Sequence, residues 1–452
     1  MSAQPLSSAT PRTELTVRGL IIGIVITVVF TAANVFFGLK AGLTFATSIP
    51  AAVISMAILR GFKNSTMQEN NIVQTVASSA GTLSAIIFVL PGLVMVGWWN
   101  GFPFWETFGI CATGGILGVM YTIPLRRALV TDSDLPYPEG VACAEVLKVG
   151  GGDDAVAASE ESSKSGLLAG AAGTVVSAVF AVAVATRVFA SSVSQYFHVG
   201  DRGGASGYAF SLSFALLAVG HLVGLWVGLA MLLGALIAWG WAVPHYTMLA
   251  AATGAAADLA QAAWSTKVRF LGAGTIGVAA IWTLAKLVKP VIGGLSSAMA
   301  SSKARKAGQG GALPRTEHDM PIGIVGLISL LCLLPIGWLL GNFSITTGLG
   351  DHLWLLVIGG LLFVVVMGFL VSAVCGYMAG LIGSSNSPLS GVGILVVIIA
   401  ALLLLVAGVQ SQVAGDAGKG MVAFALFATS VVFAVATIAN NNLQDLKTGQ
   451  LV

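Results

Sequence analysis

Apolar segments of roughly twenty residues recur along almost the whole chain, and polar residues gather in the stretches between them. About twenty apolar residues are what an α-helix needs to cross the hydrocarbon core of a bilayer. Only 9% of the 452 residues are charged, whereas a soluble domain carries roughly 25% charged residues. The sequence therefore predicts an all-α polytopic membrane protein with about 11–12 transmembrane helices. The candidate spans are 17–37, 42–60, 73–97, 104–125, 166–190, 207–220, 221–243, 268–289, 321–341, 353–374, 388–409 and 420–440.

Two glycine- and proline-broken stretches, 38–50 and 376–388, share one pattern. Gly, Ala, Gly, Leu and Pro recur at one offset, since 376 − 38 and 388 − 50 both give 338. Interrupted hydrophobic segments at corresponding positions of two repeats indicate a transporter binding site, because unwound backbone offers polar groups at membrane depth. The sequence predicts two repeat units with discontinuous helices, and substrate contacts within both breaks. The candidate contacts are Ser48, Pro50, Ser384, Ser385, Asn386, Pro388 and Ser390.

The segments between the spans suggest a domain organisation. A polar N-terminal tail (1–14) precedes a first membrane repeat unit (15–295), which contains an acidic, flexible cytoplasmic loop (126–165). A Ser-, Gly- and Lys/Arg-containing linker (296–320) leads to a second unit (321–452). A complete second unit would need roughly two hundred residues beyond the second break. We therefore expect a truncated chain with an incomplete second unit, and leave open whether it functions alone.

Basic residues predict the orientation, since Lys and Arg near span ends favour the cytoplasmic side. With the N-terminus inside, Arg18, Lys63, Arg127 and their basic neighbours all fall inside, and loops 98–103 and 342–351, which lack Lys and Arg, fall outside. This count makes the repeat inverted. The N-terminal region has no obvious cleavage site, so the first span is expected to be retained in a multi-pass protein of the cytoplasmic membrane.

Several kinds of site are not indicated by the sequence. Four cysteines without a CxxC pair are expected to be reduced, and five scattered histidines give no metal-binding spacing. GxGxxG at 272–277 opens an apolar span without a preceding strand, so it does not indicate a dinucleotide site, and no ATP-binding P-loop is present. We expect no cofactor, no resident metal and no nucleic-acid partner.

Polar residues also open the third span. Asn70, Asn71, Gln74 and Thr75 lie one turn apart near its N-terminus, where free N–H groups favour a carboxylate or an anionic chelate. These four are candidate substrate-binding residues. Ordinary helix capping by asparagine is the alternative.

Several motifs resemble the oligopeptide transporter family, and within it the bacterial members near the yellow stripe-like metal-chelate branch. The motifs occupy 14–18, 33–42, 70–78, 123–127, 135–148, 383–391 and 442–449. Ser387 departs from the family's Asn-Pro-x-Ser-Gly element, and Leu446 from its Asp-Phe-Lys-Thr-Gly element, which leaves the substrate open. The resemblance implies secondary active, usually proton-coupled uptake of short peptides or of metal bound to amino-acid-derived chelators.

Proton coupling needs an acidic group that burial can influence. Glu139, Glu145 and Asp445, all in family motifs, are the candidates, whereas Glu106 lies in an aromatic belt and fits an interfacial position. The predicted partners are a peptide or other small-molecule substrate, protons and membrane lipids, and a homo-oligomer is left open. A passive channel is the first alternative. An intramembrane enzyme is the second, but no convergent set of nucleophile, base or metal ligands supports it.

Overall fold

The computed structural model describes residues 14–41, 44, 47–151, 186–200, 203–212, 225–250, 253–279, 319–387, 389–408 and 418–452, with single residues and short stretches between 168 and 292. The chain forms two compact units, Met1–Glu161 with Ala280–Val452 (unit 1) and Ser162–Ala279 (unit 2). This division cuts across the predicted first repeat unit 15–295, because unit 2 has a small core of its own. The two predicted repeats are therefore compared below by the order and direction of the helices within unit 1.

Eight helices in the described part of the chain are long and apolar enough to cross a membrane. The all-α polytopic class is therefore confirmed. The eight are Val17–Leu39, Met67–Met95, Phe104–Thr131, Gly228–Ala250, Ile322–Thr346, Gly350–Ile382, Leu389–Val406 and Lys419–Leu451.

Two predicted spans differ from the structure. In the stretch 42–60 the helix α2 (Ser48–Leu59) has only 12 residues, which at 1.5 Å per residue is too short to cross a bilayer as a helix alone. The stretch 207–220 begins within a strand, β2 (Gly204–Ser211). Candidate spans 166–190 and 268–289 lie partly outside the described residues.

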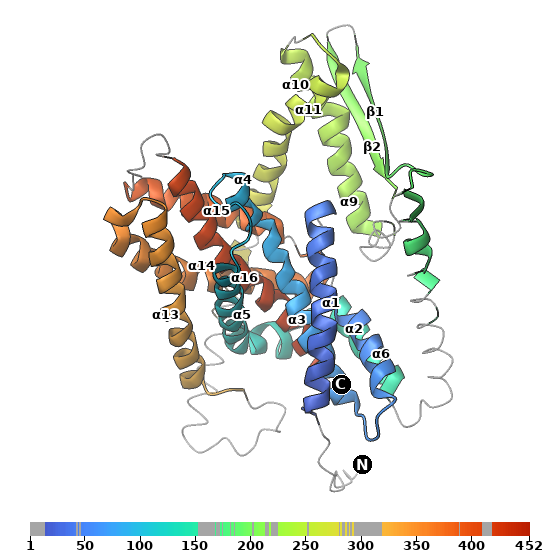
Figure 1. The fold of residues 1–452 in the computed structure, drawn as a ribbon, viewed down its shortest axis with the longest axis vertical. Coiled ribbons are helices and arrows are strands. Elements are labelled where there is room, and N and C mark those ends of the chain that lie inside the picture. Colours follow the sequence, from blue (N-terminus) through green and yellow to red (C-terminus); the bar gives the residue numbers. More distant parts are fainter. Residues whose placement is uncertain are drawn as a thin grey trace. The chain divides into compact units, whose positions relative to one another are not determined.

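The first three-helix set of unit 1 consists of α1 (Val17–Ala41), α2 and α3 (Met67–Leu83) (Figure 1). The chain continues from α3 through η1 (Ser84–Phe88) into α4 (Pro91–Met95). Thr27 of α1 donates a hydrogen bond to the Val76 carbonyl of α3. Asn34, about two helical turns further along α1, donates to the Gly81 carbonyl of α3. Contacts advance together along both helices, so α1 and α3 are parallel and pack on each other. Helix α2, which lies between them in the sequence, runs in the opposite direction and packs on α3.

A second set repeats this arrangement with α14 (Leu353–Ile382), α15 (Leu389–Val406) and α16 (Lys419–Leu451). Gly368 of α14 packs on Val435 of α16 and Gly376 packs on Leu443, so α14 and α16 are also parallel. The two sets meet where α3 crosses α16, and Ser78 bonds there to Asn441.

The two sets run in opposite directions. Gln68, at the start of α3, donates to the carbonyl of Val452, which follows the end of α16. Because Ser78 bonds to Asn441 further along α3, the two helices are antiparallel. An inverted repeat requires this relation between its halves.

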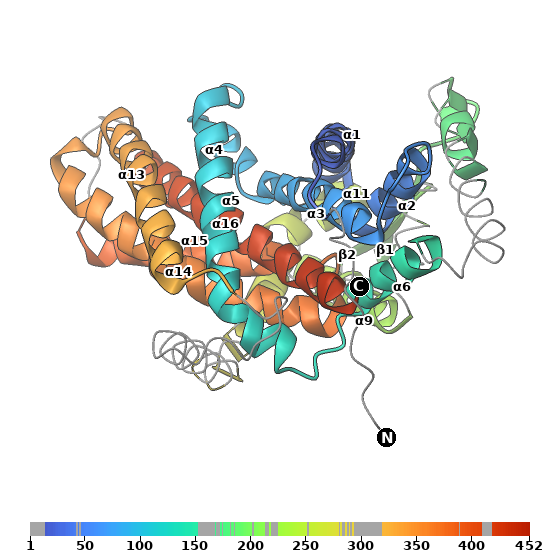
Figure 2. The same cartoon turned by 90° about the horizontal axis from the view of Figure 1, so that it is seen from below.

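Helix α16 is the centre of unit 1, and 83% of its apolar window is buried. Figure 2 shows it between the α1–α3 set and the helices α5 (Phe104–Arg126) and α13 (Ile322–Thr346). The main core cluster includes Leu117, Phe343 and Phe427 of these helices.

The predicted flexible loop 126–165 is wrong in part, because the π-helical turn η2 (Arg127–Thr131) and α6 (Pro138–Gly151) lie within it. Residues 152–165 are outside the described part.

The ends of unit 1 group the loops as the basic residues predicted. The Arg18 guanidinium donates to the carbonyls of Lys63 and Asn64, so the start of α1 and loop 60–66 share one end. At the other end, the rings of Trp99 and Phe343 are 6.5 Å apart, which brings together the two loops predicted to be outside.

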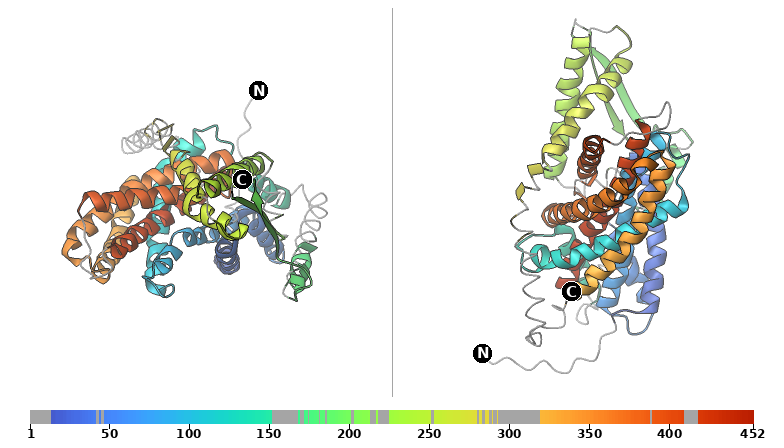
Figure 3. Two further views of the ribbon diagram at one scale, coloured as in Figure 1. Left: turned by 90° about the horizontal axis from the view of Figure 1, so that it is seen from above. Right: turned by 90° about the vertical axis from the view of Figure 1, so that its left-hand side faces the viewer.

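Unit 2 contains a β-hairpin and a set of helices (Figure 3). Strands β1 (Ser192–Val199) and β2 pair antiparallel from Ser192↔Ser211 to Val199↔Gly204. The helical elements are α9 (Leu225–Ala235), η3 (Leu236–Ala242), α10 (Val243–Ala250), α11 (Ala256–Ala263) and η4 (Trp264–Val268). The Thr247 hydroxyl of α10 accepts a bond of 2.9 Å from the Ala205 N–H of β2, which ties the hairpin to the helices.

Candidate functional site

The second predicted break is an unwound turn between α14 and α15. It begins at Gly383, which has a φ of +90°, a conformation that L side chains rarely adopt. A Cβ atom at Gly383 would lie 2.6 Å from Cδ of Glu139, so glycine also provides the space for that carboxyl group. The turn then runs through Ser384–Ser387 before α15 begins at Leu389.

Amide side chains of α16 bind the backbone that this turn leaves free. Oε1 of Gln444 accepts from the N–H of Ser384 at 2.8 Å, and Nδ2 of Asn440 donates to the Ser384 carbonyl at 3.2 Å. The Ser387 hydroxyl donates to Oδ1 of Asn440 at 2.8 Å. Backbone polar groups at membrane depth need such partners, and α16 therefore stabilises the unwound conformation.

Glu139, at the start of α6, reaches the same turn. Its Oε2 accepts from the Ser384 hydroxyl at 3.2 Å and from the Ser385 N–H at 3.3 Å. The start of α6 is held by a bond from Tyr137 N–H to the Gly380 carbonyl at 2.7 Å. Burial raises the pKa of the Tyr137 phenol, so this side chain stays neutral beside the turn. The predicted site residue Glu139 thus lies at the predicted break.

Glu145 does not reach this turn. It is exposed and forms an ion pair of 2.9 Å with Lys148 on the same helix. Six residues of a helix separate Glu145 from Glu139, and the two side chains therefore point in different directions.

A buried polar cluster surrounds Asp445 where α3 crosses α16. Nδ2 of Asn441 donates to Oδ2 of Asp445 and to Oγ of Ser78, both at 2.8 Å. Gln74 also lies against the Asp445 carboxyl. The exposed fraction is 3% for Asp445 and 0% for Gln74 and Asn441.

This cluster holds polar atoms with unused bonding capacity. Oδ1 of Asp445, Oε1 of Gln74 and Nε2 of Gln444 are buried and have no hydrogen-bond partner among the described residues. The cations Arg18, Arg126, Arg127 and Lys148 form ion pairs with other carboxylates, namely Glu69, Asp319 and Glu145, and not with Asp445. Native proteins satisfy most buried polar groups, so Asp445 and Gln74 in this cluster, and Gln444 at the Ser384 turn, keep bonding capacity for a bound water, ion or substrate group.

The first break reaches this crossing from the other side. The Thr47 hydroxyl donates to the Ala77 carbonyl of α3 at 3.4 Å, directly next to Ser78. Ser48 is 1% exposed and its hydroxyl has no partner among the described residues, and Pro50 lies in the first turn of α2. The first break therefore contacts α3 directly beside Ser78, whereas the second break reaches Ser78 through Asn441 of α16, which bonds to Ser384 and to Ser78. Positions 42, 43, 45 and 46 are outside the described part.

The remaining predicted contacts are spread out. Asn70 accepts from Ser55 at 2.6 Å and donates to the Thr66 carbonyl, so it joins α2 to α3 rather than facing the cluster. Asn71 and Thr75 both accept from the Gln74 amide and hold it in place.

The other predicted residues of the second break divide between its two sides. Asn386 caps α14 by donating to the Ile382 carbonyl. Ser390 is exposed, and Pro388 lies outside the described residues.

Sequence reasoning missed Ser78, Asn440, Asn441 and Gln444. A usable signal existed, because a run of three asparagines and a glutamine continues an otherwise apolar helix. Such residues in a membrane span face the protein interior.

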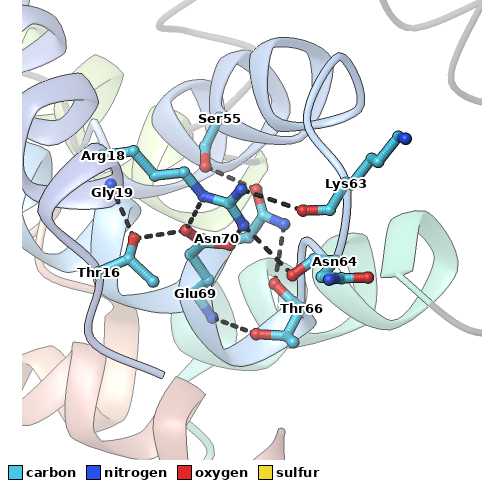
Figure 4. Close-up of polar contacts among 9 residues, drawn as sticks. All are labelled: Thr16, Arg18, Gly19, Ser55, Lys63, Asn64, Thr66, Glu69 and Asn70. Carbon is cyan, nitrogen blue, oxygen red and sulfur yellow. Dashed lines mark hydrogen bonds and ion pairs between the residues drawn. The ribbon is translucent and has the colours of Figure 1, made fainter. Parts of the chain in front are cut away.

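The start of α1 is locked to α3 by Glu69 (Figure 4). Glu69 is 1% exposed and accepts from the Arg18 guanidinium at 2.7 and 2.8 Å and from the Thr16 hydroxyl. Thr66 caps α3 by accepting from the Glu69 N–H. The pair Thr66 and Glu69 has the spacing of a capping box, and the carboxylate binds Arg18 in addition to the backbone of Thr66.

Within the described residues, no group of three or more His, Cys, Asp or Glu side chains could hold a metal ion. The four cysteines are unpaired. Burial and the nearby Asp445 raise the pKa of the Cys143 thiol to about 12, which makes it a poor ligand or nucleophile. The geometry thus offers amides, hydroxyls and two carboxyl groups, Glu139 and Asp445.

The family model for the OPT oligopeptide transporter protein matches residues 14–452. The chain belongs to the oligopeptide transporter family. The family and the relatives below are transporters, not enzymes, and the resemblance read from the motifs is therefore confirmed.

A protein of Haemophilus influenzae named as an oligopeptide transporter is 47% identical over 424 residues, covering 92% of this chain and 65% of that relative. A metal-nicotianamine transporter of Oryza sativa subsp. japonica is 26% identical over 181 residues, covering 30% of this chain and 26% of the relative. An iron-phytosiderophore transporter of the same plant is 28% identical over 171 residues, covering 30% and 24%. The chain thus spans less than two thirds of the length of these relatives. No solved structure matches it.

Proposed function

We propose that the whole protein is a secondary active, proton-coupled transporter in the bacterial cytoplasmic membrane. Its substrates are short peptides or metal chelates of amino-acid-derived ligands. Family membership supports the transporter class, and the named relatives support these two substrate classes.

The observation that carries this proposal is the buried polar cluster at the crossing of two inverted helix sets. Unwound backbone, amides and carboxyl groups meet there. Thr47 of the first break bonds to Ala77 of α3, and Ser384 of the second break bonds to Asn441, which in turn bonds to Ser78 of α3. In transporters built from inverted repeats, substrate and coupling ions bind near the midplane where discontinuous helices meet. Rocking one set against the other exposes such a site alternately to the two sides.

We assign the coupling proton to Asp445. Burying an ionised, unpaired carboxylate is costly, whereas the neutral acid can be buried if it is hydrogen-bonded. The Asp445 carboxyl is 3% exposed, and Oδ1 has no partner among the described residues. Proton loading and closure of the crossing therefore favour each other, which biases the two conformations.

Transport by the full chain tests this proposal. Radiolabelled trialanine or iron(III)-nicotianamine is added outside proteoliposomes that contain the protein. An inward proton gradient is then imposed. We expect accumulation above the external concentration that a protonophore abolishes. A passive channel would only equilibrate the substrate.

Asp445→Asn tests the coupling role, because asparagine keeps the shape of the side chain but cannot release a proton. We expect loss of gradient-driven accumulation with retained exchange of substrate across the membrane. The control is Glu145→Gln, an exposed position on α6, which should accumulate substrate normally. Undiminished accumulation by Asp445→Asn would exclude the assignment.

A further inference from the structure

We propose that the turn after α14, with Gln444, is a binding pocket for a substrate carboxylate, and that Glu139 is its intramolecular occupant until substrate displaces it. The inference rests on the proposed function, since it assumes that substrate reaches the crossing. It names the chemical group recognised and a self-inhibitory contact within the same site.

Hydrogen-bond donors of the turn converge on one point. The Ser384 hydroxyl and the Ser385 N–H both lie within bonding distance of Oε2 of Glu139, and the hydroxyl has Oδ1 of Asn441 at 3.4 Å as a second, more distant acceptor. Gly383, which carries no side chain, lets the carboxyl group approach the backbone. Small donors and close backbone approach are how proteins bind carboxylates and phosphates.

Gln444 adds a donor that Glu139 leaves unused. Its Oε1 is fixed by the Ser384 N–H at 2.8 Å, which determines the orientation of the amide. Its Nε2 is therefore aimed beside the same turn, fully buried and without a partner among the described residues. The pocket thus offers more donors than its present occupant uses.

The occupant fits loosely. The bonds from Ser384 and Ser385 to Glu139 are 3.2 and 3.3 Å, whereas charge-assisted bonds to carboxylates are about 2.5–2.9 Å. The Ser385 side is exposed and Glu139 itself is only half-buried, so an incoming carboxylate has a path to the donors. A free substrate carboxylate can take up the donor geometry that the tethered Glu139 does not reach.

The two substrate classes share this group, since peptides end in a carboxylate and amino-acid-derived chelators carry carboxylates. An occupant that fills the pocket in nine molecules of ten lowers the apparent affinity for a competitor about tenfold. Removing the Glu139 carboxylate should therefore strengthen substrate binding. A residue that only supported the turn would weaken it.

Chemical rescue tests the carboxylate pocket without reference to transport. Purified full-length Glu139→Ala is heated in detergent with propionate, a free carboxylate slightly larger than the missing fragment, or with its uncharged amide, propionamide. We expect propionate to raise the Tm of Glu139→Ala and to leave the wild type and Glu145→Ala unchanged. Equal effects of propionate and propionamide, or none on Glu139→Ala, would overturn the pocket.

Substrate-like probes test the displacement. Binding of trialanine and of citrate is measured by calorimetry in the absence of a proton gradient, beside trialanine amide and trimethyl citrate. At least one carboxylate probe should bind Glu139→Ala, or Glu139→Gln where the alanine variant fails to fold, about tenfold more tightly than wild type. Its blocked analogue should not gain affinity.

Unchanged or weaker binding of both carboxylate probes would overturn the displacement. Because these measurements need no gradient, they can fail while proton-driven uptake succeeds, and the reverse also holds. Gln444→Glu, which replaces the unused donor by an acceptor, should remove binding of both carboxylate probes. Retained binding in that variant would contradict the role of Gln444.

Discussion

Gly383 combines a positive φ with a close approach to the Glu139 carboxyl, so we expect Gly383→Ala to destabilise unit 1. A non-glycine residue in such a conformation costs about 1–3 kcal/mol, and its Cβ would lie 2.6 Å from Cδ of Glu139. Thermal unfolding in detergent should show a lower Tm. The matched control is Gly359→Ala within α14, which meets no atom within 4 Å and should be neutral or slightly stabilising. Equal Tm values for the two variants would contradict this account.

The Arg18 and Glu69 pair should contribute measurably to stability. Removing one partner leaves a buried charged group unsatisfied, and Glu69 is 1% exposed. We expect Arg18→Leu to lower the free energy of unfolding, because the Glu69 carboxylate loses its charged donor. In the background of Glu69→Gln the same change should cost less, and equal costs would show that the two residues act independently. Arg60→Leu, at an exposed position, should stay within about 0.5 kcal/mol of wild type.

Single residues of the candidate site were predictable where their backbone was unusual. The motif around Ser384 and Ser385 identified the unwound turn. Glu139 was predicted as a proton-coupling residue, and its contact with this turn was not foreseen. Asn70 was predicted from its position near a helix N-terminus, but the structure gives it partners on α2. Which face of α3 meets α16 depends on a pairing across 363 residues, and no local pattern specifies that.

At the scale of elements, α16 holds the turn open through a ladder of amides, so Asn440 should control its dynamics. Asn440→Ala removes the bonds to the Ser384 carbonyl and the Ser387 hydroxyl. Leaving such groups unpaired costs about 1–3 kcal/mol. We expect faster hydrogen exchange at 384–387, measured by mass spectrometry. Asn442→Ala, whose side chain bonds to Thr122 of α5 instead, should leave this exchange unchanged, and similar acceleration in both variants would refute the ladder.

The helix breaks could be predicted because glycine and proline change the backbone conformation locally. The repeat could be predicted because these residues recur at one offset in the sequence. The length of α2 could not, since Pro50 fits the first turn of a helix and the helix begins at Ser48. The hairpin of unit 2 was missed because its strand residues 204–211 are as apolar and small as a helical segment. Periodicity cannot separate short apolar strands from helices. Helix α6 was taken for a loop because its acidic residues suggested solvent exposure, whereas Tyr137 and Cys143 are buried.

At the scale of the whole molecule, charge and packing agree on the two ends of unit 1. Lys and Arg placed the start of α1 and loop 60–66 inside, and the bonds from Arg18 to Lys63 and Asn64 bring them together. Trp99 and Phe343 bring together the loops expected outside. An inverted repeat needs this alternation, because its halves enter the membrane from opposite sides.

Cysteine labelling tests this orientation in intact cells. Three of the four native cysteines are buried, so background labelling by a membrane-impermeant maleimide should be low. Asn100→Cys, in loop 98–103, should react from outside, whereas Lys63→Cys should react only after the membrane is permeabilised. The reversed pattern would invert the molecule and turn uptake into export for the same gradient. Labelling of both positions from one side would place the two ends of α3 on the same face of the membrane. The inverted arrangement, and with it a binding site shared by the two breaks, could then not be maintained.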